Sequence, residues 1–176
     1  MKKISILLGV FMLVFTSCNI ESLDDDIGSS SNSIVGKWRM IDYTYTGETI
    51  TSAQGQELST SFVGEAFDMT NTITFSEDPN VITSEGSFSL RLTSNTLGQT
   101  STQTITGLEA INDGNWERDG DELFTFTDMG EGVMNIDKLT ESILVLSVSQ
   151  EEDLSQAGFR IISNIDAIVT LERVTD

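Results

Sequence analysis

Residues 37–46 read KWRMIDYTYT, and residues 164–173 read NIDAIVTLER. In both stretches apolar side chains alternate with polar ones, which is typical of a β-strand with one face on a core. The same alternation recurs between them in TNTITFSE, SFSLRLT, LFTFTD, GVMNID and ILVLSV. Stretches with a helical period are scarce, so the sequence predicts strands nearly throughout. The last strand places its apolar residues on one face, namely Ile165, Ala167, Val169 and Leu171.

Turn signals separate the predicted strands. The strongest is Asp119-Gly120, because both residues tolerate a positive φ. We expect Gln150 to Gly158 to be the longest of the late loops. Eight to ten antiparallel strands joined by hairpins must close, since an open meander exposes its edges to aggregation. The sequence therefore predicts an all-β fold, an antiparallel up-and-down β-barrel. The other turns are expected at 54–56, 78–80, 95–98, 129–132 and 138–142.

Composition excludes several classes of function. The 176 residues include 28 acidic and 9 basic ones, which gives a formal charge of 9 − 28 = −19. The length suits one domain. Because there is no histidine, an imidazole base, a Ser–His or Cys–His couple and a histidine-ligated metal are excluded. The single cysteine cannot form an internal disulfide.

The N-terminus has the layout of a secretory signal. Lys2 and Lys3 precede an apolar stretch, Ile4 to Phe15, that is too short to span a membrane. Small residues then lead to Cys18, and Phe15-Thr16-Ser17-Cys18 resembles the lipobox of bacterial lipoproteins. We expect residues 1–17 to be removed and Cys18 to carry the lipid anchor. The alternative is an ordinary signal peptide with an incidental cysteine.

Residues 18–33 follow as the lipidated cysteine and an acidic Ser, Gly and Asp tether, without apolar periodicity. Acidic residues behind the anchor, Glu21 and Asp24 to Asp26, resemble the surface-export signal of Bacteroidota-type lipoproteins; a solvated linker is the alternative. The expected location is the bacterial outer membrane, and the export signal would expose the protein on the cell surface. Removal of residues 1–17 leaves 7 − 28 = −21 charges. Such a chain repels nucleic acid, so the membrane is reached through the lipid on Cys18.

Several blocks in residues 34–176 resemble the lipocalin-like domain of Bacteroidota lipoproteins. Gly36-Lys37-Trp38 opens the first strand as the Gly-x-Trp motif does in lipocalins. The resemblance implies a calycin-type barrel that is open at one end, with no particular ligand. The supporting blocks are residues 74–80, 84–88, 97–99, 114–116, 119–121, 139–140, 144–146 and 171–173.

The resemblance also implies a structural pair at the closed end. In lipocalins an arginine near the end of the last strand stacks on the indole of the Gly-x-Trp motif. Arg173 shares parity with Val169 and Leu171, so it can point inward beside Trp38. The alternative is an exposed arginine near a frayed terminus. We expect the pocket to open at the other end, along Tyr43 to Thr46.

Large apolar side chains on the predicted inner face either line a ligand cavity or fill the barrel. An eight-stranded barrel has room for packed side chains or for one small ligand. The threonines from Thr100 to Thr106 would line a more polar mouth. The candidate ligand-lining residues are Phe75, Phe88, Leu90, Trp116, Phe124 and Phe126.

Carboxylates are the remaining chemical candidates. Asp119, Asp121 and Glu122 surround a hairpin turn, where solvent keeps them ordinary, and the run from Asn112 to Asp121 does not fit an EF-hand. We therefore expect no catalytic residue, no metal and no cofactor. The leading hypothesis is a monomeric, lipid-anchored, non-enzymatic barrel that binds a small, largely apolar ligand. The alternatives are a structural or protein-interaction lipoprotein with a filled core, and an enzyme that uses carboxylates alone.

Overall fold

The structure, a computed structural model, describes residues 33–156 and 158–175. The chain divides into two units, Met1–Ser31 and Asn32–Asp176, and the described residues all belong to the second. The predictions for the signal peptide, Cys18 and most of the tether lie outside the described residues. Among the residues that are described, no helix is long and apolar enough to cross a membrane.

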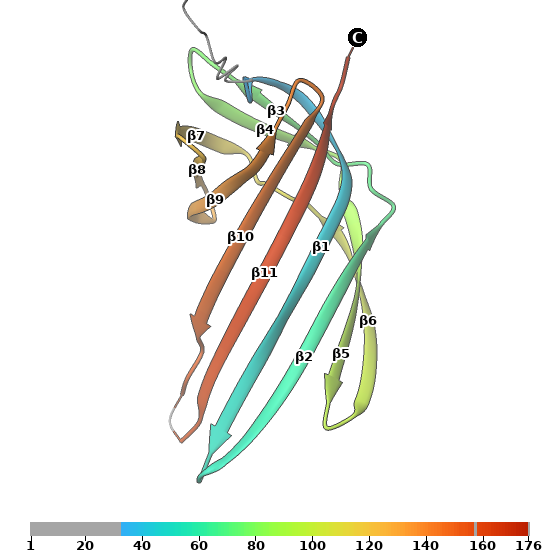
Figure 1. The fold of residues 1–176 in the computed structure, drawn as a ribbon, viewed down its shortest axis with the longest axis vertical. Coiled ribbons are helices and arrows are strands. Elements are labelled where there is room, and N and C mark those ends of the chain that lie inside the picture. Colours follow the sequence, from blue (N-terminus) through green and yellow to red (C-terminus); the bar gives the residue numbers. More distant parts are fainter. Residues whose placement is uncertain (1–32, 157, 176) are drawn as a thin grey trace, which may run out of the picture. The chain divides into compact units, whose positions relative to one another are not determined.

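Eleven strands account for most of the described residues (Figure 1), which confirms the prediction of an all-β fold. Every pairing between them is antiparallel. In chain order the strands are β1 (Gly36–Ala53), β2 (Gln56–Phe67), β3 (Thr72–Ser76), β4 (Val81–Glu85), β5 (Phe88–Thr96), β6 (Gln99–Leu108), β7 (Gly114–Asp119), β8 (Glu122–Thr127), β9 (Gly130–Leu139), β10 (Ile143–Asp153) and β11 (Arg160–Arg173).

Eight of these strands form a closed ring. Strands β11, β10, β9, β8, β7, β4, β3 and β1 pair in that order, and β11 pairs again with β1. The closed ring confirms the predicted antiparallel up-and-down barrel. The remaining strands, β2, β5 and β6, continue the sheet from the second part of β1. In chain order each of them comes directly before or after a short strand of the ring: β2 precedes β3, β5 follows β4, and β6 precedes β7.

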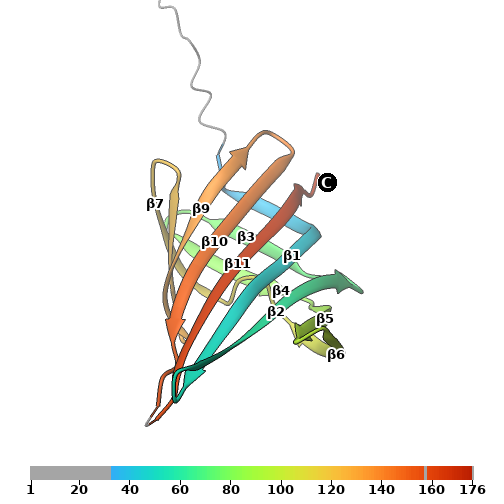
Figure 2. The same cartoon turned by 60° about the horizontal axis from the view of Figure 1, so that its bottom comes forward.

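The strands differ in length, so the barrel is closed over only one half. Strand β1 pairs with β3 over Gly36–Arg39 and with β2 over Thr44–Ala53. Strand β9 pairs with β10 only as far as Ser147. Beyond these points the wall consists of β10, β11, β1, β2, β5 and β6 alone, and Figures 1 and 2 show these strands running past the short β7–β9 segment. We call the concave face of this part the trough, and the ring above it the closed half.

The predicted late loop is shorter than expected. Strand β10 continues to Asp153, which pairs with Ile162 of β11, and an isolated bridge joins Gln156 to Phe159. The prediction of a loop from Gln150 was wrong because those polar residues are paired on one side with a long neighbouring strand. Polar composition is compatible with a solvent-exposed strand of this kind.

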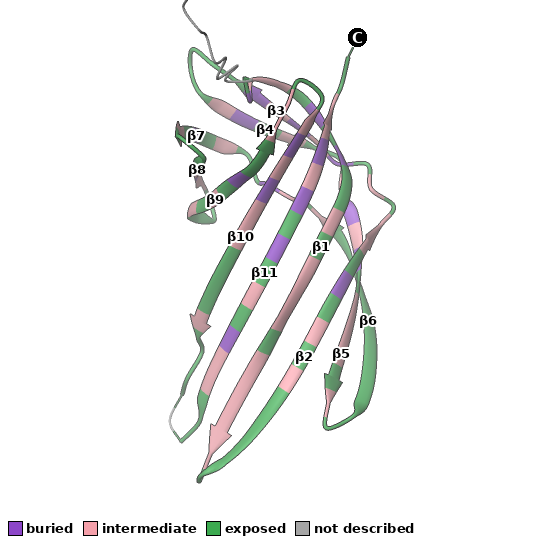
Figure 3. Cartoon of the chain, in the orientation of Figure 1, coloured by how far each residue is buried: buried purple, intermediate pink, exposed green. Residues whose placement is uncertain are grey.

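The closed half has a packed interior (Figure 3), with buried residues concentrated in that part of the ribbon. Asn71, the largest fully buried polar side chain, donates to Ser84 Oγ and the Glu85 carbonyl and accepts from the Ala110 amide. Its hydrogen bonds tie β4 and the β6–β7 connection to the core. The largest fully buried apolar residues are Trp38, Phe75, Met40, Ile73, Ile82, Leu123, Leu144, Leu146 and Leu171.

Arg173 and Trp38 lie at the end of the closed half. The two residues are register partners on β11 and β1, and the guanidinium carbon lies 4.1 Å from the indole centroid. The guanidinium also donates to the carbonyls of Val35 at 2.8 Å, Ser33 at 2.6 Å and Glu141 at 2.7 Å. One side chain therefore joins the entry to β1, the β9–β10 turn and the last strand.

Gly36 is required by the same arrangement. A Cβ at this position would lie 2.4 Å from Nη1 of Arg173, and the backbone has φ +134. No other residue fits both the space and the backbone conformation. The glycine of the Gly-x-Trp motif thus provides the room in which the arginine reaches its carbonyl acceptors.

We expect Arg173→Met to lower the free energy of unfolding by about 2–4 kcal/mol, because it removes the stacking and leaves three carbonyls without their donor. The matched control is Arg39→Met, since Arg39 forms an exposed ion pair with Glu172. That control should cost no more than about 1 kcal/mol. Urea unfolding of both variants measures the difference, and equal losses would contradict the structural role of Arg173.

Candidate functional site

The trough begins where the packed core ends, and aromatic rings mark this boundary. The ring of Tyr43 lies 5.0 Å from that of Phe88, and the ring of Tyr45 is stacked 5.5 Å from that of Phe62. The register places Tyr43 opposite Val169 and Tyr45 opposite the buried Ala167. The first part of the trough is therefore an aromatic and aliphatic surface.

Gly47 allows one of these rings to lie flat on the sheet. A Cβ at Gly47 would lie 2.4 Å from Phe62 Cζ and 2.3 Å from the Asn164 carbonyl oxygen. Because the position has no side chain, Phe62 covers the backbone of β1 in place of a residue of that strand.

Hydroxyl groups replace apolar side chains farther along the trough. The hydroxyls of Thr49 and Ser163 form a hydrogen bond of 3.1 Å, and those of Thr60 and Thr96 form one of 2.8 Å. Thr49 lies on the same face of β1 as Tyr45, and Thr60 lies on the same face of β2 as Phe62. Both threonines are farther from the core than these rings. The surface thus changes from apolar near the core to a band of hydroxyls, and beyond this band Ala53, Leu58 and Leu97 line the open end.

A small cavity lies beside Tyr43, on the side of the core away from Trp38. Its volume is about 60 Å³, and a neighbouring cleft of about 350 Å³ shares Ala110 and Met134 with it. The cleft lies between the β6–β7 connection and the β8–β9 turn, with Gln150 of β10 on its edge. The other cavity residues are Leu146, Ser147, Val148, Ala167 and Val169.

Asn71 positions one wall of this cavity through its hydrogen bond to the Ala110 amide, at 3.2 Å. The sequence analysis did not select this residue. An asparagine between two strands normally indicates a turn, and only the structure shows that its side chain is buried and bonds to two separate segments, β4 and the β6–β7 connection.

The two tyrosine hydroxyls are the polar groups at the boundary. Neither forms a hydrogen bond with another residue in the described part of the chain. Burial raises the pKa of Tyr43, and a charge on Tyr45 would raise it further. Burial also raises the pKa of Tyr45, with a second contribution from the Glu152 carboxylate. Both hydroxyls therefore stay protonated at neutral pH and can donate to a ligand.

The predicted lining residues separate into three groups. Phe75 and Trp116 pack edge to face at 5.9 Å within the closed half, so they fill the interior instead of lining a cavity. The Trp116 indole donates to the Ser76 carbonyl at 2.9 Å. Phe88 and Leu90 are buried at the boundary with the trough.

Phe124 and Phe126 lie on the outer face of β8, which corrects the prediction that they face inward. Their neighbours Leu123 and Thr125 are buried instead, and Thr125 is opposite the inward-facing Trp116. The alternation along β8 was predicted correctly, but its pairing with β7 turns Leu123 and Thr125 toward the interior and the two phenylalanines away from it. The two phenylalanines are half-buried on the outside of the barrel.

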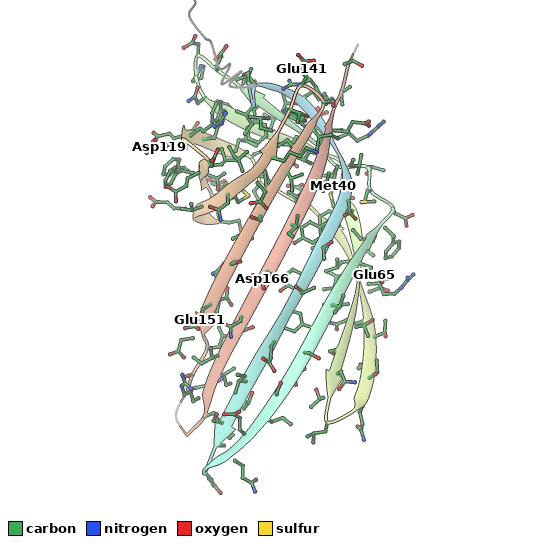
Figure 4. The ribbon with its side chains drawn as sticks, viewed as in Figure 1. Met40, Glu65, Asp119, Glu141, Glu151 and Asp166 are labelled. Carbon is green, nitrogen blue, oxygen red and sulfur yellow. The ribbon has the colours of Figure 1, made fainter. Side chains whose placement is uncertain are left out.

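The acidic residues of the β7–β8 turn do not line the cavity or the cleft. Asp119 and Glu122 are paired at the exposed β7–β8 hairpin (Figure 4), next to Asp121. Within residues 33–156 and 158–175 no three acidic or cysteine side chains are grouped as metal ligands are. The arrangement described above is an apolar surface with tyrosine, threonine and serine hydroxyls beside a small cavity.

Comparison with known proteins agrees with this geometry. The family model described as the lipocalin-like domain matches residues 34–146, more than half of the chain. The chain belongs to the lipocalin-like domain family. No curated protein and no solved structure matches it. In this lipocalin-like domain the matched residues end on β10, so β11, which closes the barrel against β1, lies beyond the match.

The tyrosines of this lipocalin-like domain provide a direct test of the boundary. They are the only two in the chain, so its tyrosine absorbance titration reports them alone. Because both pKa values are raised, we expect a midpoint above the ordinary value of 10.0. Tyr45→Phe should leave the single transition of Tyr43. A midpoint at or below 10.0 would show that the hydroxyls face bulk water.

Stability should follow the same shifts. The unfolded chain releases tyrosine protons at about pH 10, whereas the folded chain retains them. This contribution is therefore complete below pH 10 and is lost as the pH rises through the higher folded values. Tyr43→Phe should reduce the alkaline loss of stability in urea unfolding.

Proposed function

We propose that this lipocalin-like barrel is a non-enzymatic binding protein for a small, largely apolar ligand held where the trough meets the core. The observation that carries the proposal is the largely apolar cavity beside Tyr43, which shares Ala110 and Met134 with a larger cleft. An apolar surface with a few polar groups is typical of ligand sites.

The volumes determine how a ligand would sit. A cavity of about 60 Å³ has room for about two waters, because each water occupies about 30 Å³ in the liquid. Ligand sites usually measure about 300–1,000 Å³, a range that includes the adjoining cleft. We therefore infer that an apolar end of the ligand enters the cavity and that its body lies in the cleft. The Tyr43 hydroxyl and the Gln150 amide are then available to its polar groups.

A filled-core interaction protein is the second candidate. It is favoured by the closed half, whose interior is occupied by Trp38, Phe75 and Met40 without exposure to solvent. In that case the trough would be a surface feature and no small molecule would accompany the protein. Native mass spectrometry of the protein from its own host distinguishes the two candidates.

We also propose that the protein is anchored by lipid on Cys18 at the bacterial outer membrane. The lipobox-like residues 15–18 support this anchor, and the net charge of −19 argues against binding to anionic head groups by a basic patch. Acidic residues behind the anchor support exposure on the cell surface.

Blocking the cavity should remove ligand binding. Val148→Trp would place an indole in the cavity that Val148 lines. We expect affinity for N-phenyl-1-naphthylamine, an uncharged apolar fluorescent probe, to fall by at least about tenfold, or about 1.4 kcal/mol. The matched control is Val133→Trp on the outer face, where the side chain is 47% exposed. Fluorescence titration should give equal affinities for Val133→Trp and wild type. Equal binding by Val148→Trp would contradict the proposed site.

Removing the anchor should change fractionation. We expect Cys18→Ala to leave the membrane fraction and to partition into the aqueous phase of a detergent separation, because each buried CH₂ of a lipid chain contributes about 0.8 kcal/mol. Replacement of Glu21 and Asp24 to Asp26 by Ala is the control, since it retains the anchor. If surface export depends on these residues, it should also lower labelling of intact cells. Membrane association of Cys18→Ala would contradict lipid anchoring.

A further inference from the structure

The incomplete wall leaves two long free strand edges. Strand β6 pairs only with β5, and the last part of β10, from Val148 to Asp153, pairs only with β11. No other described strand pairs with either edge. A free edge presents unpaired N–H and C=O groups to any other strand, and proteins normally protect it with charges, proline or a bulge.

The two edges differ in this protection. Glu151, Glu152 and Asp153 end the free part of β10, and Glu151 is seen on this part of the strand in Figure 4. Strand β6 reads QTSTQTITGL, with no charge and no proline over ten residues. Its one register irregularity lies near the core end, opposite Phe88 to Leu90. At about 3.4 Å per residue, ten residues give an accessible edge about 34 Å long.

Charge indicates which partner fits this edge. Residues 88–108, the β5–β6 hairpin, contain Arg91 as their only charged residue, a charge of +1. The rest of the chain then carries −19 − 1 = −20. Two copies of the chain repel one another over most of their surface, but they can approach through this hairpin without bringing acidic residues together.

We propose that two copies of this chain associate through β6, as antiparallel strands about a two-fold axis perpendicular to the sheet. This symmetry is the usual one for a homodimer, and it pairs an edge with itself. The two concave faces then lie on the same side, so the troughs join across one continuous sheet. The dimer replaces the monomer of the hypothesis from the sequence, and it does not depend on the proposed ligand.

The side chains of β6 suit such a pairing. Thr102 lies opposite Thr93 of β5, with their hydroxyls 3.4 Å apart. Thr100 and Thr104 lie on the same outer face as Thr102 and are exposed. Across the two-fold axis these threonines would meet their counterparts, and cross-strand threonine pairs are favourable in sheets.

Salt dependence distinguishes this dimer from association through charged groups. The pairing itself uses backbone hydrogen bonds, whereas the remaining −20 charges of each copy oppose it. Added salt screens that repulsion. We therefore expect dimerisation of the full-length chain in neutral detergent to strengthen with rising sodium chloride, as measured by sedimentation velocity.

A charge placed on the edge should separate the copies. Thr102→Glu puts two like charges across the axis, so the dissociation constant should rise at least about tenfold. Thr102→Lys should do the same. An equimolar mixture of the two variants should dimerise again, to within about threefold of wild type, because the charges then attract. The matched control, Thr44→Glu, adds the same charge to an exposed position of β1 that has strands on both sides, and it should leave the dimer unchanged.

Thermal melting of each variant verifies that the barrel is folded. The proposal is supported if the mixture of Thr102→Glu and Thr102→Lys dimerises again and if the wild-type dimer becomes tighter as the salt concentration rises. A wild-type chain that stays monomeric at all salt concentrations overturns it, and so does a dimer that is unaffected by Thr102→Glu or weakened by salt. If β6 instead receives an extended segment of another protein, the wild type is monomeric by itself, which also overturns the pairing of two copies.

Discussion

The barrel depends on the seam between its first and last strands. Without the β1–β11 pairing the eleven strands would form an open sheet that ends at β11 and β6. The seam begins at Trp38 and Arg173 and continues to Ser52 and Arg160. At its start the guanidinium stacks on the indole and donates to three carbonyls that would otherwise lack a protein donor. One arginine thereby satisfies three carbonyls from two segments, which a neutral side chain of similar size cannot do.

Closure at one end determines what the other end can do. The ring requires all eight strands, but β8 and β9 extend only along the closed half. Apolar side chains therefore fill the ring, and the longer strands continue as a sheet with one concave face. The cavity beside Tyr43 lies where these two regions meet, because the packed layers end there while the wall on the β10 and β11 side continues.

Alternation along the chain predicted the strands well but could not always assign their faces. In β11 the buried apolar residues Ala167, Val169 and Leu171 share one parity. Arg173 has the same parity, and together with the family resemblance this placed it correctly beside Trp38. In β8 both parities carry plausible interior residues. The pairing of Trp116 with Thr125 decides the matter, and it leaves Phe124 and Phe126 outside. The lengths of the strands could not be predicted either, because they depend on pairing with strands that are distant in sequence. The cavity and the Asn71 hydrogen bonds result from such distant contacts, so the sequence did not indicate them.

Glycine and aromatic residues together shape the trough. At Gly47 the missing side chain lets Phe62 lie on β1, where any Cβ would meet both the ring and the Asn164 carbonyl. The stacked Tyr45 and Phe62 rings then form a flat surface on the sheet. Farther along, paired hydroxyls take their place. Beyond these hydroxyls the trough is apolar again at Ala53, Leu58 and Leu97. The hydroxyls therefore form a polar band between two apolar parts of the trough, so the apolar surface next to the core is limited to the rings near Tyr43, where the cavity lies.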